Sequence, residues 1–96
     1  MDCILTTGGT GIGERDNTPD VTISWCDKLI PGISDFLGNE SLKQTKHALL
    51  SRAVAGVKGN TLIINIPGSV RGAVFCTKLI VEIIPHALKM VHGEGH

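Results

Sequence analysis

The sequence predicts an α/β domain with an open sheet and a ligand crevice at one edge of that sheet. An apolar run at residues 3–7 leads into a glycine-rich loop and then a helix start. A second apolar run, at residues 61–66, leads through Pro67–Ser69 into another helix. In open α/β sheets, ligands bind outside the carboxyl ends of parallel strands. If the two runs are parallel neighbours, both turns open on one crevice.

The first two elements follow from local signals. The run at residues 3–7 begins with the consecutive apolar residues Cys3, Ile4 and Leu5, which is typical of a parallel strand covered on both faces. Thr18 is a capping residue and Pro19 suits the first helical position, so a helix is expected to begin there. Its apolar face extends to about residue 30, and the Pro-Gly pair at 31–32 is expected to end it.

The middle of the chain predicts a helix followed by a hairpin. A second helix is expected from about residue 33 to residue 44, with a weak point at Gly38, and a short helical turn at 45–50. The apolar runs at 53–57 and 61–66 are separated by Lys-Gly-Asn, which is the spacing of a β-hairpin. The second of these runs is apolar on consecutive positions, so it is expected to lie centrally in the sheet.

The last helix is expected to begin near Val70, with Ser69 as its N-cap and free amides pointing outward. Its apolar residues keep the 3.6-residue spacing of an amphipathic helix. Pro85 is expected to kink or restart it. The tail at residues 92–96 carries two histidines, but two glycines and a chain end argue against a preformed metal site, so we interpret it as frayed.

Composition excludes several classes of function. The 96 residues suffice for one small domain, and 42% of them are hydrophobic, as suits a packed core. The formal net charge is zero and aromatic residues make up 3%, which argues against a nucleic-acid partner. No apolar run approaches the roughly 20 residues that span a bilayer. Three cysteines without C-x-x-C spacing fit structural thiols in a reducing cytosol, so a cytoplasmic location is expected.

The glycine-rich loop at residues 8–13 has the chemistry of an anion site. Glycine lets the backbone lie close to a ligand, and exposed amides can hold phosphate or carboxylate oxygens. Asp16 places a carboxylate at the mouth of this loop, where a divalent cation on a phosphorylated ligand would sit. Two alternatives remain open: the glycines serve the geometry of a tight turn only, and Asp16 pairs with Arg15 or caps the following helix.

Several stretches of the sequence together resemble the molybdopterin-binding family. This family includes the molybdopterin adenylyltransferases, bacterial molybdenum-cofactor proteins and the N-terminal domain of gephyrin. The similar stretches are LTTGGTG at 5–11, RDNTPD at 15–20, LSRAVAGVKG at 50–59, TLIINIPGS at 61–69 and IPHAL at 84–88. The resemblance covers nearly the whole chain and matches the family's C-terminal half.

The resemblance implies a fold and an activity. The fold is a three-layer α/β sandwich with a mostly parallel sheet plus a β-hairpin, here lacking the first strands, so residues 1–96 are expected to form a single but partial domain. The implied activity is Mg²⁺-dependent adenylylation of molybdopterin with ATP, which is a nucleotidyl transfer, and the implied assembly is a homotrimer. Without the missing half, the strand at 3–7 is expected to expose its edge and the crevice to lack one wall.

The resemblance also implies roles for individual residues. The residues that would line the ligand loop are Gly8, Gly9, Thr10 and Gly11. The residues that would form the side binding the pterin phosphate are Asn65, Pro67, Gly68 and Ser69. Asp16 would be the catalytic and metal-binding residue, because it would hold magnesium or orient the phosphates.

Some interpretations stay open at this point. Arg52 is either a structural ion-pair partner or a phosphate ligand. Lys58 and Arg71 could add positive charge to the crevice, and His47 fits a surface residue better than a proton carrier. The alternative function is a non-catalytic molybdopterin-binding or scaffold module of the same family, because the family includes members whose enzymatic role is doubtful.

Overall fold

A computed structural model describes residues 2–91 of the chain, so the histidine-containing tail at 92–96 lies outside the described residues. The described part of the chain contains four strands, three α-helices and one 3₁₀ helix. In chain order they are β1 (Asp2–Thr7), α1 (Thr18–Trp25), β2 (Lys28–Leu29), α2 (Pro31–Leu42), the 3₁₀ helix η1 (Lys46–Leu50), β3 (Ala55–Lys58), β4 (Thr61–Ile66) and α3 (Val70–Val91).

The strands form one mixed sheet in the order β1-β4-β3-β2. β1 and β4 are parallel, with Ile4 opposite Ile63 and Thr7 opposite Ile66. β3 pairs antiparallel with β4, and β2 pairs antiparallel with β3. The predicted hairpin and the predicted parallel pair are therefore both confirmed, and parallel pairing among the described strands is limited to β1 and β4.

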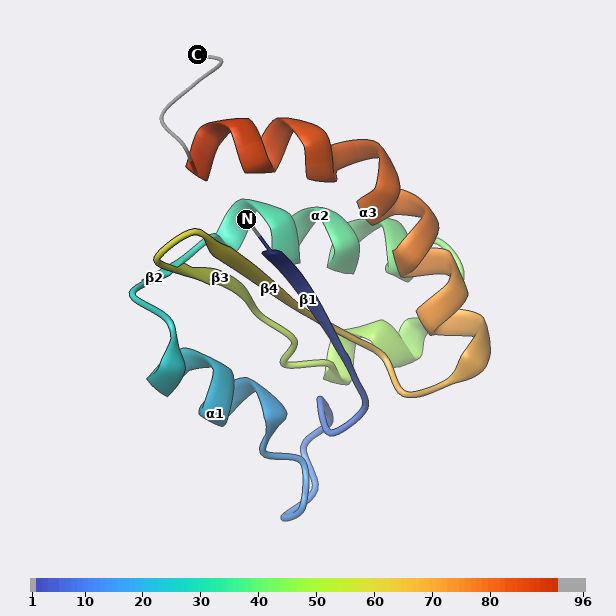
Figure 1. Cartoon of the computed structure of the whole chain (residues 1–96). Helices are drawn as coiled ribbons and strands as arrows, with labels where there is room; N and C mark the ends of the chain where they lie inside the picture. Colours follow the sequence, from blue (N-terminus) through green and yellow to red (C-terminus); the bar gives the residue numbers. More distant parts are fainter. Residues whose placement is uncertain (1, 92–96) are drawn as a thin grey trace.

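Helices cover both faces of this sheet, which confirms the predicted layered α/β fold (Figure 1). Alternate residues of β4 face opposite sides because strand side chains have a period of two. On one side, Leu62, Ile64 and Ile66 belong to a buried core shared with α2 and α3, to which α3 contributes Cys76 and Ile80. On the other side lies α1, which contacts β3 and β4.

The prediction that β1 is covered on both faces is wrong for this chain. Within residues 2–91, β1 pairs only with β4, and it forms one edge of the sheet. Ile4 and Leu5 are 41% and 38% exposed. The run of apolar residues was sufficient to predict a strand, but burial depends on neighbouring elements. The exposed edge predicted for this strand is therefore present.

The boundaries of the first two helices also differ from the prediction. Helix α1 ends at Trp25 because Cys26 turns to an extended conformation. The next residues join the sheet: the Asp27 amide donates to the Val57 carbonyl and the Ile30 amide donates to the Ala55 carbonyl, both at 2.8 Å. The Pro-Gly pair therefore begins α2 instead of ending α1, which is the position where proline fits a helix.

The remaining elements agree with the sequence prediction, except that β3 begins at Ala55 and α3 does not restart at Pro85. β4 covers residues 61–66 as predicted, α2 continues through Gly38, and a short 3₁₀ helix occupies 46–50. The last helix begins at Val70 and continues through Pro85 as one element, so the expected restart there is absent. No helix in the described part of the chain is both long and apolar enough to cross a membrane. Cys76 is buried, whereas Cys3 is exposed on the sheet edge.

Candidate functional site

The parallel pairing of β1 with β4 brings the two glycine turns into contact. The Gly8 amide donates to the Ile66 carbonyl at 3.1 Å, which joins the end of one strand to the end of the other. Gly68 approaches so closely that a Cβ built on it would lie 3.0 Å from the Cα of Gly8. The two turns therefore meet at the carboxyl ends of the two strands, where the crevice was predicted.

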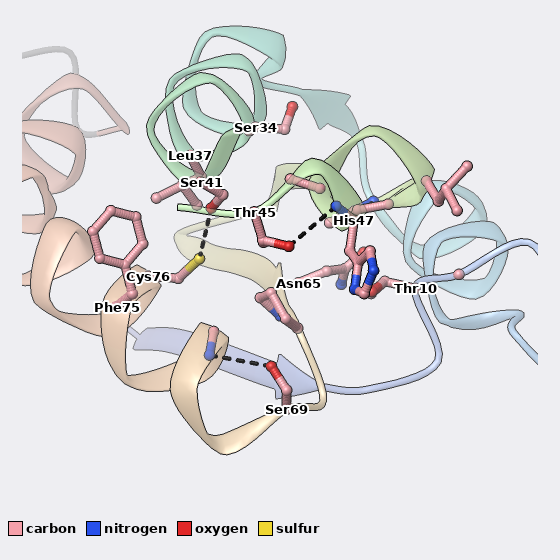
Figure 2. Close-up of a pocket in the computed structure, with 18 of the residues that line it drawn as sticks. Thr10, Ser34, Leu37, Ser41, Thr45, His47, Asn65, Ser69, Phe75 and Cys76 are labelled. Atoms are coloured by element: carbon pink, nitrogen blue, oxygen red, sulfur yellow. Dashed lines mark hydrogen bonds between the residues drawn. The ribbon is translucent and has the colours of Figure 1, made fainter. Parts of the chain in front are cut away.

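A cavity of about 800 Å³ opens beside these turns, between η1, α2 and the first turns of α3 (Figure 2). The predicted site residues that line it are Thr10, Gly11, Asn65, Pro67 and Ser69. The other predicted residues, Gly8, Gly9, Gly68 and Asp16, do not line it. Gly8 and Gly68 form the contact behind it, and Gly9 and Asp16 belong to the loop at its rim.

The loop between β1 and α1 keeps a run of backbone amides free. Within residues 2–91, no hydrogen bond from the amides of Gly9, Thr10, Gly11 or Ile12 is made to a protein acceptor. Consecutive free amides form a concave anion site of the kind found in phosphate-binding loops. Thr10 is 7% exposed, so the first part of this run lies against the protein and not in bulk solvent.

Asp16 is folded back onto the loop. Its Oδ2 accepts a hydrogen bond from the Gly13 amide at 2.9 Å, while Arg15 makes no ion pair with it and α1 has no side-chain cap. Neither alternative partner foreseen for Asp16 is therefore used. The described residues contain no cluster of three or more histidine, cysteine or acidic side chains that could hold a metal ion. Mg²⁺ is usually bound by one or two carboxylates plus substrate phosphates, so a single carboxylate suits a cation carried by phosphates.

Asn65 joins three elements beneath the cavity. Its Oδ1 accepts from the Val54 amide at 3.2 Å, and its Nδ2 donates to the hydroxyls of Thr6 at 2.9 Å and Thr22 at 3.0 Å. The residue is 2% exposed. Both amide hydrogens are committed to protein acceptors, so the side chain holds β1, β4 and α1 together where the two strands end.

The other end of the cavity comes largely from α2, η1 and the segment between them, which the sequence prediction did not assign to a site. Arg71 on α3, predicted as a possible source of positive charge in the crevice, also lines it. The polar residues at this end include Ser34, Ser41, Gln44, Thr45, His47 and Arg71. The Thr45 hydroxyl accepts from the His47 amide at 3.2 Å, and the Ser41 Oγ lies 3.7 Å from the Cys76 Sγ. Ser34 and Ser41 are seven residues apart on one stripe of α2, but polar residues on a helix surface carry no sequence signal of what they face.

The N-terminus of α3 closes the cavity on the side of the second turn. The Ser69 hydroxyl accepts from the Gly72 amide at 3.1 Å, which is the N-cap predicted from the sequence. Arg71 and Phe75 follow on the first turns of this helix and line the same cavity. A helix N-terminus carries a partial positive charge, so this end of the cavity favours an anionic group.

Comparison with known proteins identifies the family. Residues 1–86 match the family model described as "Probable molybdopterin binding domain", and the chain belongs to this family. It is 46% identical over 91 residues to the molybdenum cofactor synthesis protein cinnamon of Drosophila melanogaster, covering 95% of this chain and 15% of that protein. It is 38% identical over 93 residues to a molybdopterin adenylyltransferase of Helicobacter pylori, covering 97% of this chain and 53% of that enzyme.

The fold is similar to that of solved members. The molybdopterin biosynthesis Mog protein from Mycobacterium ulcerans superposes with a TM-score of 0.92 at 39% sequence identity. The superposition covers 98% of this chain and 61% of that structure. The chain thus spans about half the length of the Helicobacter enzyme and about three fifths of the Mycobacterium structure. A role in molybdenum cofactor biosynthesis follows from the family.

Proposed function

We propose that this chain provides the ligand-binding segment of a molybdopterin adenylyltransferase, which joins AMP from ATP to the phosphate of molybdopterin. The observation that supports it most strongly is the contact between the two glycine turns at one end of a cavity of about 800 Å³. A reaction between two phosphorylated substrates needs two anion sites held next to each other. The named activity of the Helicobacter relative agrees with this proposal.

In the proposed reaction, an oxygen of the molybdopterin phosphate attacks the α-phosphorus of ATP, and the bond to the β-phosphate breaks to release pyrophosphate. Such a transfer needs little covalent chemistry from the protein, which mainly positions the phosphates and stabilises their charge. The free amides at Gly9–Ile12 would hold one phosphate group. Ser69, Pro67 and Gly68, at the start of α3, would hold the other.

Magnesium would neutralise the negative charge of the phosphates during transfer. Asp16 is the residue that would hold it, since Oδ1 of this carboxylate makes no hydrogen bond within the described chain. Asn65 would contribute by fixing the ends of β1 and β4, because its amide hydrogens are already bonded to Thr6 and Thr22. The proposal includes the cytoplasm as the location and a homotrimer as the assembly. The homotrimer suits a chain of zero net charge, because copies of it do not repel one another through net charge.

The test places the 93-residue matching segment of this chain in the Helicobacter pylori enzyme and measures ATP-dependent pyrophosphate release with purified molybdopterin. We expect turnover, and we expect Asp16→Asn to lower it by about 100- to 1000-fold, the usual loss when one charge-stabilising group is removed. Glu14→Gln is the matched control, because Glu14 is an exposed acid on the same loop.

Two other outcomes would count against the proposal in different ways. If Asp16→Asn keeps full turnover, Asp16 serves only the shape of its loop. If the folded chimera binds molybdopterin and ATP without turnover while the parent enzyme is active under the same conditions, the chain is a binding or scaffold module and the enzymatic proposal is wrong.

A further inference from the structure

Arg52 lies behind the glycine-rich loop and binds several of its carbonyl groups. Its Nε donates to the Gly11 carbonyl at 3.0 Å and its Nη2 donates to the Asp16 carbonyl. Its own backbone amide donates to the Thr10 carbonyl at 2.7 Å. A single residue in the segment between η1 and β3 therefore holds three carbonyl groups of a loop some 40 residues earlier in the chain.

An ion pair holds the guanidinium group in place. Nη1 and Nη2 of Arg52 donate to the two carboxylate oxygens of Asp20 at 3.2 and 3.1 Å. Asp20 lies in the first turn of α1, directly after the loop. The planar fork of arginine is suited to such a bidentate bond, and its other N–H groups reach the loop carbonyls of Gly11 and Asp16. Arg52 thus ties the loop to the start of the helix that follows it.

The direction of these carbonyl groups determines the direction of the free amides. In a planar trans peptide, the N–H of one residue points opposite to the carbonyl of the residue before it. The Thr10 and Gly11 carbonyls point to Arg52, so the N–H groups of Gly11 and Ile12 point away from it. Thr10 and Gly11 line the cavity and Arg52 does not. The two amides are therefore presented on the side of the loop that faces away from the arginine.

We propose that Arg52 is a positioning residue: it binds the carbonyl side of the glycine-rich loop so that the Gly11 and Ile12 amides are held ready for a phosphate oxygen. It acts through the backbone and does not contact the phosphate. This inference rests on the proposed function for the identity of the phosphorylated ligand, but the arrangement of the amides can be tested without adenylyl transfer.

The test is an NMR titration of the chain with inorganic pyrophosphate, following each backbone amide. In the unchanged chain, the Gly11 and Ile12 resonances shift, whereas Gly13, whose amide is bonded to Asp16, shifts little. Arg52→Lys keeps the charge, but an ammonium group cannot reach all four oxygens that the guanidinium group binds. It should therefore weaken pyrophosphate binding by about tenfold, measured at a temperature well below that of unfolding. Arg15→Lys is the matched control on the same loop, and its affinity for pyrophosphate should stay within about twofold of that of the unchanged chain.

Each result decides the inference. It is overturned if Arg52→Lys binds pyrophosphate as the unchanged chain does, or if pyrophosphate leaves Gly11 and Ile12 unshifted in the unchanged chain. The second criterion applies even if Arg52→Lys fails to fold. Shifts at Gly11 and Ile12, lost in Arg52→Lys, together with no adenylyl transfer in the chimera, support the role of Arg52 and count against the proposed reaction alone.

Discussion

Gly68 and Gly8 meet backbone to backbone: a Cβ on Gly68 would lie 3.0 Å from the Cα of Gly8 and 3.6 Å from its amide nitrogen. The neighbouring atoms are main-chain atoms, which cannot move aside as a flexible side chain can. The distance between the two glycine turns is therefore set by the absence of a side chain at position 68. A molecule that bridges both turns depends on this distance.

We expect Gly68→Ala to separate the two turns and to destabilise the chain by about 1–3 kcal/mol, the usual cost of adding a group to a close-packed site. Thermal unfolding measures the stability, and pyrophosphate titration measures the site. Gly32→Ala is the control, because a Cβ at position 32 would meet no atom within 4 Å. Equal unfolding temperatures for Gly68→Ala and Gly32→Ala would show that the contact between the turns is not tight.

Asn65 provides a second prediction, because removing its side chain has different effects if it is a structural anchor or a ligand contact. Asn65→Ala removes the acceptor of the Val54 amide and the donors to the hydroxyls of Thr6 and Thr22, while Thr22 keeps its bond to the Thr18 carbonyl. We expect a loss of about 2–4 kcal/mol in unfolding free energy, since unpaired buried polar groups are costly. Chemical denaturation measures it.

Asn39→Ala is the matched control for that experiment, because Asn39 is exposed on α2 and alanine favours helix. Its stability should be unchanged or slightly higher. If Asn65→Ala unfolds like the unchanged chain but loses pyrophosphate binding, Asn65 is a ligand contact and the structural role assigned to it is wrong.

The ion pair between Asp20 and Arg52 predicts that the conformation of the glycine-rich loop depends on pH in the acid range. The hydrogen bond from Arg52 lowers the pKa of the Asp20 carboxyl below its ordinary value. The ion pair therefore contributes fully above the ordinary aspartate pKa of about 3.9, and its contribution is lost as the pH falls through the lower pKa of the folded chain. Since both groups are exposed, the effect on global stability is small and the effect on the loop is the better readout.

We therefore expect the Gly11 and Ile12 amide resonances to move as the pH is lowered below about 4. In Asp20→Asn this titration should be absent, whereas in Asp35→Asn, a change at an exposed acid on α2, it should remain. A titration that persists unchanged in Asp20→Asn would show that the ion pair does not hold the loop.

Much of the fold could be predicted because its signals are local. The apolar run of β4, the hairpin turn and the N-cap at Ser69 depend on a few neighbouring residues, and the structure confirms all three. β2 could not be predicted in the same way. It is two residues long, and it forms because residues 27–30 make hydrogen bonds to residues of β3. The residues that determine it therefore lie 25 or more positions away in the sequence.

The candidate site shows the same division. Thr10, Gly11, Pro67 and Ser69 were found because strand–glycine–helix turns are recognisable in sequence, and they do line one cavity. The contribution of α2 and η1 was missed, since serines and threonines on a helix surface carry no signal of what they face. The position of Arg52 behind the loop is likewise a result of tertiary packing, which a sequence pattern does not contain.

The exposed edge of β1 predicts that the 96-residue chain by itself associates with other copies. Ile4 and Leu5 are 41% and 38% exposed on a strand whose outer edge has no partner within residues 2–91. Ile4 also lines an apolar groove with Val21 and Trp25. An edge of this kind pairs readily with another chain. We expect self-association at tens of micromolar, with a trimer as the proposed species, measured by light scattering.

Ile4→Lys should reduce this association, because a charge on an edge strand opposes pairing. Leu49→Lys, at a 70% exposed position on η1, should leave it unchanged. A monomeric sample that is folded and soluble would count against self-association.

The same edge bears on activity. The chain covers 53% of the Helicobacter enzyme, so we propose that it is a partial domain and expect it alone to show weak ATP–Mg²⁺ binding in titration calorimetry and no turnover. The chimera should recover both, because it supplies partners for β1 and the other wall of the crevice. Micromolar binding with turnover by the isolated chain would show that β1, β4 and the two glycine turns suffice for the reaction without further cover.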